Sequence, residues 1–204
     1  MLQFNLFKFL QVRWYSSHFN MKKTVLVSKS KDIFTNLALE DWFYRNFNFE
    51  KHHILLMWQS EPCVVIGRHQ NPYIEANISE LKNITENGVV LARRNSGGGT
   101  VYHDNGNLNL SFLTRRECYD RTYNLKIIVE AVKKECDIHI DINKREDLVI
   151  NDCKVSGTAA KLGRPNSYHH CTLLVNVNKE NLSKSLKKLI YPFKRKLQNL
   201  YDLK

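Results

Sequence analysis

Apolar residues recur at helical spacing in two segments of the chain. Leu39, Phe43 and Phe47 follow one another at four-residue intervals, which predicts an amphipathic helix over 34–47. A second apolar stripe, within 122–136, consists of Leu125, Ile128, Val129 and Val132. We also expect a short helix over 78–86, because Gly88 is well placed to end it. The pattern therefore predicts two substantial helices and one short one.

Short apolar or alternating runs, typical of β-strands, account for most of the remaining chain. Leu108, Leu110 and Phe112 alternate with polar residues, as in a strand that is buried on one face. Asn151 and Asp152 separate two further runs and predict a hairpin turn. The expected strands are 54–58, 63–66, 89–92, 100–103, 108–112, 138–142, 148–150, 154–160 and 168–177. Because strands and helices do not alternate regularly, we predict an α+β domain with a mixed β-sheet flanked by helices.

The basic charge of the chain is concentrated at its two ends. The formal net charge is +11, yet residues 1–31 hold six basic and no acidic residues, and residues 182–204 hold seven basic residues and one acidic. The nearly neutral middle disfavours a nucleic-acid partner, which usually requires positive charge on the folded domain. A basic, serine-containing start without acids is typical of a mitochondrial presequence. We therefore expect a disordered mitochondrial targeting segment at 1–31, one domain at 32–181 and a basic tail at 182–204.

The composition predicts neither membrane insertion nor a disulfide framework. No apolar run approaches the roughly 20 residues that a membrane-spanning helix needs. The five cysteines are odd in number and include no C-x-x-C pair, which indicates reduced thiols. They are Cys63, Cys118, Cys136, Cys153 and Cys171.

Three consecutive glycines stand between two expected strands, directly after a pair of arginines. Gly97, Gly98 and Gly99 allow the backbone to approach a ligand closely and to present several N–H groups to it. Arg93 and Arg94 supply positive charge for a phosphate or carboxylate. The segment lacks the Gly-Lys-Ser/Thr of a Walker loop, and a strand follows it where a dinucleotide fingerprint has a helix. Judged from these residues alone, it is either an anion-binding turn or a flexible hairpin tip.

A second cluster, at 154–161, places small residues between two lysines. The small side chains leave room for a ligand that Lys154 or Lys161 is long enough to reach. A lysine in an acyl-transfer site stabilises phosphate and carbonyl oxygens as negative charge develops on them. The alternative interpretation is a pair of solvated lysines at the ends of a strand.

The run His169-His170-Cys171 offers candidate metal ligands and a candidate nucleophile. Neighbouring residues of a strand point to opposite faces, so these three side chains do not readily chelate one ion, and we expect no metal. Cys171 beside His170, or Cys153 beside Lys154, is also a candidate for a thioester-forming nucleophile. Buried, inert thiols are the commoner case, and the residues alone leave both interpretations open.

Six blocks, taken in order along the chain, resemble the lipoate–protein ligase and lipoyltransferase family. They are NLALEDW (36–42), VVIGRHQNP (64–72), LARRNSGGGTVYHD (91–104), GNLN (106–109), KVSGTA (154–159) and HHCTLL (169–174). The blocks run over roughly two thirds of the chain. One block alone is weak evidence, whereas the whole set in family order is specific.

The resemblance implies a catalytic domain shared with biotin–protein ligases, in which a mixed sheet packs against helices. It implies a site for lipoyl-AMP or a related activated acyl group, with Lys154 as the catalytic lysine that contacts both the phosphate and the lipoyl carbonyl. The implied substrate- and nucleotide-binding residues are Arg94, Gly97, Gly98, Gly99, Thr100, Val101, Tyr102 and Lys154. Neither a metal nor a covalent nucleophile is needed in such a site.

The implied acceptors are the lipoyl domains of 2-oxoacid dehydrogenase E2 subunits and the H protein of the glycine cleavage system. Neither nucleic acid nor membrane is an expected partner. Ligases that activate free lipoate with ATP usually carry a further C-terminal domain, which this chain does not reach. Cys171 stands where bacterial ligases commonly have Gly and resembles the residue of animal mitochondrial lipoyltransferases.

The absence of the further C-terminal domain from this sequence and the cysteine at position 171 both depart from the ligase pattern. Both favour a transferase that uses lipoyl-AMP or a lipoylated carrier protein. The alternatives are an ATP-dependent lipoate–protein ligase, an octanoyl- or biotinyltransferase on the same scaffold, and an inactive, truncated relic that only binds ligand. In that last case the basic tail at 182–204 is a truncated continuation of the domain.

Overall fold

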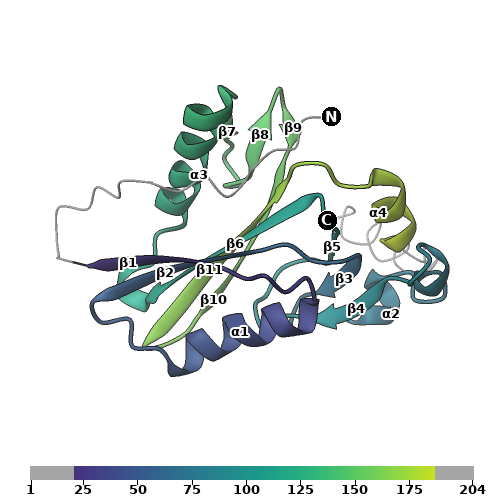
Figure 1. Cartoon of the computed structure of the whole chain (residues 1–204), viewed down its shortest axis with the longest axis horizontal. Coiled ribbons are helices and arrows are strands. Elements are labelled where there is room, and N and C mark those ends of the chain that lie inside the picture. Colours follow the sequence, from purple (N-terminus) through teal and green to yellow (C-terminus); the bar gives the residue numbers. More distant parts are fainter. Residues whose placement is uncertain (1–20, 187–204) are drawn as a thin grey trace, which may run out of the picture.

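A five-stranded mixed sheet forms the centre of the molecule. The computed structural model describes residues 21–186, and its sheet has the strand order β1-β2-β6-β11-β10 (Figure 1). These strands are β1 (Lys22–Val27), β2 (His52–Trp58), β6 (Asn107–Arg115), β11 (Asn166–Leu174) and β10 (Ser156–Leu162). The pair β1 and β2 is parallel, and every other neighbouring pair is antiparallel. The expected α+β fold with a mixed sheet is confirmed.

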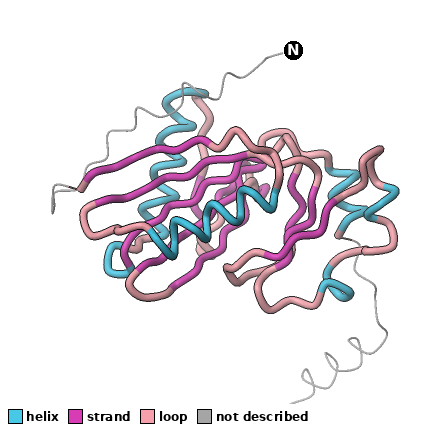
Figure 2. The backbone as a smooth tube through the Cα atoms, turned by 60° about the horizontal axis from the view of Figure 1, so that its bottom comes forward, coloured by secondary structure: helices cyan, strands magenta, loops and turns pink. Residues whose placement is uncertain are grey.

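Two helices cover opposite faces of this sheet, as Figure 2 also shows. Alternate residues of β2 divide between them: Leu56 packs with α1 (Ile33–Asn46), and Leu55 packs with α3 (Arg121–Cys136). Both helices start at an aspartate whose side chain accepts a backbone hydrogen bond from the first turn, which satisfies one otherwise unpaired N–H group. The two helices expected from the apolar stripes are therefore confirmed, within one residue at each end.

Two smaller sheets extend the fold. One has the order β4-β3-β5, with β3 (Cys63–Ile66) between β4 (Val90–Arg93) and β5 (Val101–His103). The other consists of β7 (Asp141–Ile142), β8 (Leu148–Ile150) and β9 (Cys153–Lys154). The remaining helical elements are α2 (Pro72–Glu75), η2 (Leu81–Asn83), η3 (Arg116–Cys118) and α4 (Lys179–Ser185).

The short helix expected over 78–86 is wrong. Only the 3-10 turn η2 forms there, because the Glu80 and Asn83 N–H groups donate three residues back, to Asn77 O and Glu80 O, and Leu81 O accepts from the Val89 N–H. Gly88 does end the segment, with a left-handed φ of 72°. The strand expected over 138–142 is also shorter than predicted, because only Asp141–Ile142 finds a partner strand.

The boundaries expected for the domain differ from those of the folded part. Residues 22–27, assigned to a disordered targeting segment over 1–31, form β1 and pair with β2. Helix α4 crosses the boundary expected between 181 and 182. Residues 1–20 of the expected targeting segment and residues 187–204 of the expected tail lie outside the described residues. Among the helices of 21–186, none has the length and apolar character required to cross a membrane.

Candidate functional site

The triple-glycine segment is a turn that connects β4 to β5 across the end of β3. Gly98 has φ 92°, a backbone conformation that disfavours any side chain, and a Cβ there would lie 3.0 Å from Nη2 of Arg94. Gly67, at the end of β3, approaches so closely that its own Cβ would lie 2.2 Å from Gly98 O. A Cβ at Gly97 or Gly99, in contrast, would meet nothing within 4 Å. The turn is therefore fixed on its inner side and open on its outer side.

Arg94 holds this turn from inside. Its side chain lies inward, with only 3% of the residue exposed, and burial lowers the pKa of its guanidinium. Nε and Nη2 donate to Gly97 O at 3.1 and 2.8 Å, and Nη2 also donates to Gly99 O at 2.6 Å. Nη1 donates to Val65 O at 3.1 Å. In this structure Arg94 thus bonds to the backbone of the turn, and the anion contact expected from its charge stays a prediction.

The other residues of the expected nucleotide-binding run have structural contacts. The Thr100 hydroxyl donates to Oε1 of Gln70 at 2.8 Å, and the same oxygen accepts from the Gly67 N–H at 2.8 Å. Val101 packs against a small apolar cluster at β3, and Tyr102 is buried in a second one. Burial raises the pKa of Tyr102 to about 12, so its hydroxyl stays protonated at neutral pH. These contacts build the support for the turn.

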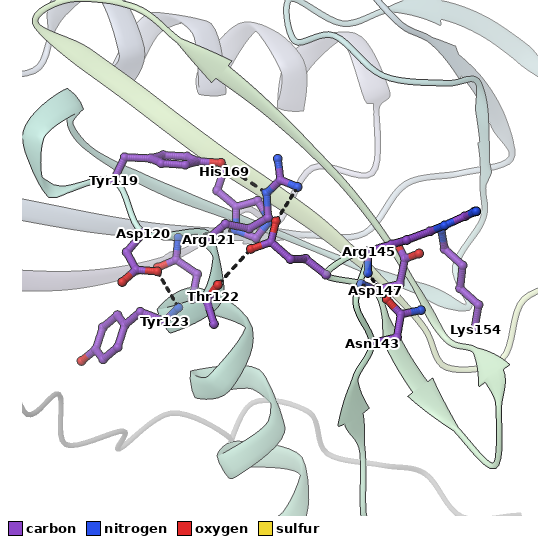
Figure 3. A network of polar contacts seen from close by, with 12 residues as sticks. Tyr119, Asp120, Arg121, Thr122, Tyr123, Asn143, Arg145, Asp147, Lys154 and His169 are labelled. Carbon is purple, nitrogen blue, oxygen red and sulfur yellow. Dashed lines mark hydrogen bonds and ion pairs between the residues drawn. The ribbon is translucent and has the colours of Figure 1, made fainter.

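Lys154 lies on the hairpin of β8 and β9. Asn151 and Asp152 form its turn in left-handed conformations, with φ values of 48° and 60°, as the sequence predicted. Lys154 Nζ lies 2.8 Å from Oδ1 of Asp147 (Figure 3), and the lysine side chain is 56% exposed while that of Asp147 is 13% exposed. The lysine is therefore an accessible cation with one fixed partner.

The glycine turn lies against β10, the strand that follows the hairpin of Lys154. A Cβ at Gly98 would lie 3.4 Å from Cβ of Ala159, which places β10 against the turn. Ala159 is five residues after Lys154, a distance of about 16 Å along an extended strand. Within residues 21–186, no recorded hydrogen bond or ion pair joins Lys154 to the turn itself. The predicted site thus extends along β10, with the glycine turn and Lys154 at separate points.

His169 and His170 face opposite sides of the sheet, as expected for neighbours in a strand. His169 lies toward α3, where Nδ2 of Asn124 is 3.4 Å from its Nδ1, and His170 lies toward α1, with its Nδ1 3.3 Å from Oε1 of Glu40. Burial lowers the pKa of His169 to about 3 and raises that of Cys171 to about 12. Cys171 is thus a buried neutral thiol. No group of three or more metal-ligating side chains forms among residues 21–186.

An apolar cavity lies on the other side of the sheet from the glycine turn. It measures about 300 Å³ and is lined by aliphatic residues of α3 and of the sheet face that packs with it. None of the predicted site residues lines it, although Val155, next to Lys154, does. This cavity is therefore distinct from the turn.

The sequence did not predict a role for two acidic residues near the site, Asp147 and Glu40. The hairpin register could have indicated Asp147: Val149 pairs with Lys154, and Asp147 lies two residues before Val149 on the same face of the strand. Glu40 lies within one of the family blocks, but its spacing on α1 resembles that of any core position. It is buried, with 1% of the residue exposed.

Residues 32–204 match the family model described as the lipoyl protein ligase A/B catalytic domain. The chain is 49% identical over 173 residues to the mitochondrial lipoyl amidotransferase LIPT1 of Homo sapiens, a match that covers 81% of this chain and 46% of that protein. Its fold is similar to the crystal structure of Plasmodium falciparum LipL1 in complex with lipoate, with a TM-score of 0.68, 35% identity, and coverage of 81% of this chain and 52% of that one.

The fold is also similar to the bipartite lipoate protein ligase of Thermoplasma acidophilum, studied with its E2 lipoyl domain. The TM-score is 0.68 at 27% identity, with coverage of 88% of this chain and 71% of that one. The chain spans about half the length of the first curated relatives that it matches.

Proposed function

This chain belongs to the lipoyl protein ligase A/B catalytic-domain family, and on that basis we propose that it is a lipoyltransferase. The observation that carries the proposal is the glycine turn, which is fixed from inside by Arg94 and open on its outer side. Such a turn presents backbone N–H groups to a phosphate without the cost of ordering them at the moment of binding.

The proposed donor is lipoyl-AMP or a lipoylated carrier protein, and the proposed acceptor is a lysine of a lipoyl domain. Support comes from the names of relatives: the human protein is a lipoyl amidotransferase, LipL1 was crystallised with lipoate, and the archaeal ligase was studied with an E2 lipoyl domain. E2 subunits of 2-oxoacid dehydrogenases are the first acceptors to test, and glycine cleavage H protein is the second. The ATP-dependent ligase, the octanoyltransferase and the inactive relic remain the alternatives.

In the proposed reaction the acceptor lysine attacks as a free amine. Its nitrogen forms a bond to the lipoyl carbonyl carbon, the bond from that carbon to the phosphate oxygen breaks, and AMP leaves as an anion while the amine loses a proton to solvent. Lys154 stabilises the negative charge on the carbonyl and phosphate oxygens, and the turn amides at Gly97 to Gly99 orient the phosphate. No thiol takes part, which is consistent with the buried, neutral Cys171.

We propose a mitochondrial location for the chain. The basic, acid-free composition of residues 1–20 is typical of a presequence. Two relatives, from Homo sapiens and Mus musculus, are named as mitochondrial proteins. Because β1 begins at Lys22, the cleavable part of a presequence is placed before it.

The decisive experiment mixes the purified chain with an apo lipoyl domain and one donor at a time. The donors are lipoyl-AMP, a lipoylated carrier protein, lipoate with ATP, and octanoyl-AMP, and the readout is the mass of the acceptor. We expect a lipoyl mass shift with lipoyl-AMP or the carrier. A shift only with lipoate and ATP supports the ligase alternative, and the absence of any shift supports the relic.

The role of Lys154 is tested by Lys154→Leu, with Lys126→Leu as the matched control. Lys126 is an exposed lysine on α3, away from the hairpin. We expect Lys154→Leu to abolish transfer with an unchanged thermal unfolding midpoint, while Lys126→Leu transfers as the wild type does. Wild-type transfer by Lys154→Leu contradicts the assigned role.

A further inference from the structure

The turn that precedes β8 forms a closed hydrogen-bonded unit. Oδ1 of Asn143 accepts from the N–H groups of Arg145 and Asp147 at 2.8 and 3.0 Å. The Asn143 N–H donates to Asp147 O at 3.0 Å, and the Glu146 N–H donates to Asn143 O at 2.9 Å. These four bonds fix the backbone from 143 to 147, so that the position of one residue of the turn determines that of the next.

Glu146 stands in this turn in a left-handed conformation, with φ 58°. A glycine adopts this conformation more readily than a residue with a side chain does, so the glutamate stands here at a cost in backbone energy. Both oxygens of its carboxylate have partners at the start of α3. Arg121 Nη1 donates to Oε2 at 3.0 Å, and the Thr122 hydroxyl donates to Oε1 at 2.9 Å. The carboxylate thus ties the turn to the helix.

Arg121, which binds Glu146 at the start of α3, is itself connected to the core. Arg121 Nε lies 3.5 Å from the Tyr119 hydroxyl, and the Tyr119 ring packs edge-on against His169 with the ring centroids 6.4 Å apart. His169 is fully buried in β11, which lies between β6 and β10 in the large sheet. A path of direct contacts therefore leads from the sheet core through Tyr119 and Arg121 to Glu146.

The residue after Glu146 is Asp147, whose carboxylate lies 2.8 Å from Lys154 Nζ. We propose that Glu146 is a positioning residue for Lys154: it fixes the turn on α3 so that Asp147 holds the lysine ammonium in one orientation. This inference rests on the proposed catalytic role of Lys154. Glu146 itself does not contact substrate in this scheme.

Orientation, and not stability, is the expected benefit of this arrangement. An ion pair whose lysine is more than half exposed contributes little to folding because solvent screens it. A free lysine side chain, however, samples many rotamers, and a small misplacement of a catalytic group costs a large factor in rate. The bonds of Arg121 and Thr122 to the Glu146 carboxylate, here called the Glu146 clamp, reduce the rotameric freedom of Lys154 indirectly, through the backbone of the turn.

The first test compares Glu146→Gly with Glu135→Gln, which removes a carboxylate of α3 that lies 3.8 Å from Lys134 Nζ. Glycine fits the left-handed backbone, so this variant removes the clamp without adding strain. We expect kcat for transfer to fall about ten- to a hundredfold, with little change in KM for the lipoyl domain. We expect Glu135→Gln to behave as the wild type does. An unchanged kcat in Glu146→Gly overturns the inference.

The second test separates a positioning role from a general effect on folding. Peptide mass spectrometry follows acylation of Lys154 by an amine-reactive ester, with Lys126 in the same sample as the reference. In Glu146→Gly the rate at Lys154 should approach that of Asp147→Asn, while the rate at Lys126 stays constant. The double variant Glu146→Gly/Asp147→Asn should lose no more kcat than Asp147→Asn alone, because both changes interrupt the same path of contacts to Lys154. Additive losses in kcat, or an unchanged rate at Lys154, overturn the inference.

These outcomes are distinguishable from failure of the proposed function. If Lys154→Leu transfers normally, the function assigned to the lysine is wrong, whatever Glu146 does. If Lys154→Leu is inactive while Glu146→Gly keeps both normal transfer and normal Lys154 labelling, only the positioning role is wrong.

Discussion

The hydroxyl of Ser111, on β6, donates a hydrogen bond to the carboxylate of Glu40, which α1 holds against the sheet. Only 1% of Glu40 is exposed, and a buried carboxylate is costly unless its charge and its hydrogen-bonding capacity are compensated. His170 provides a second partner at 3.3 Å. The positive charge of Arg94 also interacts with Glu40, so the network under α1 is coupled to the residue that holds the glycine turn.

Removing this carboxylate should destabilise the fold. Glu40→Ala leaves the buried Ser111 and the partly buried His170 without their partner, and we expect the free energy of unfolding to fall by about 3 kcal/mol. Asp41→Ala is the matched control on the same helix: it breaks an ion pair with the exposed Arg45 and one with the partly buried Lys161, and should cost less than Glu40→Ala, about 1 to 2 kcal/mol. Urea unfolding measures both values, and equal losses would show that Glu40 is no more than another helix charge.

The sequence was most informative where burial alone decides the structure. The apolar stripes that predicted α1 and α3 are long enough for the 3.6-residue period to be clear. The segment 78–86 has only one buried residue, Leu81, whose carbonyl accepts from the Val89 N–H eight residues on, while the Asn77 N–H just before the segment donates to the distant Ser185 O. Local propensity could not predict those partners.

The candidate site shows the same division. Residue types indicated an anion-binding turn, but the direction of Arg94 depends on carbonyl groups that only the folded turn brings together. The ion pair of Asp147 and Lys154 depends on the register of the β8–β9 hairpin. The sequence predicted the turn of this hairpin but not its register. The roles of the site residues in catalysis stay predictions.

Substitution of two glycines should separate the support of the turn from its ligand-binding side. A Cβ at Gly67 would lie 2.2 Å from Gly98 O, so Gly67→Ala must displace the turn and should cost about 2 kcal/mol of stability. It should also weaken binding of a non-reactive lipoyl-AMP analogue, measured by calorimetry, by at least about tenfold. Gly97→Ala meets nothing within 4 Å and should change stability by less than about 0.5 kcal/mol. Tight binding by Gly67→Ala contradicts the proposed importance of the turn.

Acid should destabilise the protein through two buried histidines. Burial lowers the pKa of His103 and of His169 to about 3, whereas in the unfolded chain each titrates near its ordinary value of about 6.5. Between these values the unfolded state binds protons that the folded state does not, so stability falls as the pH is lowered through this window. Each histidine contributes a slope of at most about 1.4 kcal/mol per pH unit.

The measurement is urea unfolding at a series of pH values below neutrality. His169→Gln should reduce the slope of stability against pH by the contribution of one histidine. An unaltered slope in His169→Gln would show that His169 is protonated in the folded state.

Arg94→Lys distinguishes a residue that holds the turn from one that contacts the anion. A lysine keeps the charge but lacks the planar fork that bonds to the carbonyls of Val65, Gly97 and Gly99, so we expect stability to fall by about 2 kcal/mol and analogue binding to weaken with it. Arg93→Lys is the control: Arg93 also donates to three backbone carbonyls, but it is exposed, and water replaces the lost bonds at a cost below about 1 kcal/mol. If Arg94 contacted the phosphate directly, Arg94→Lys would instead retain stability and show only weaker, more salt-sensitive binding.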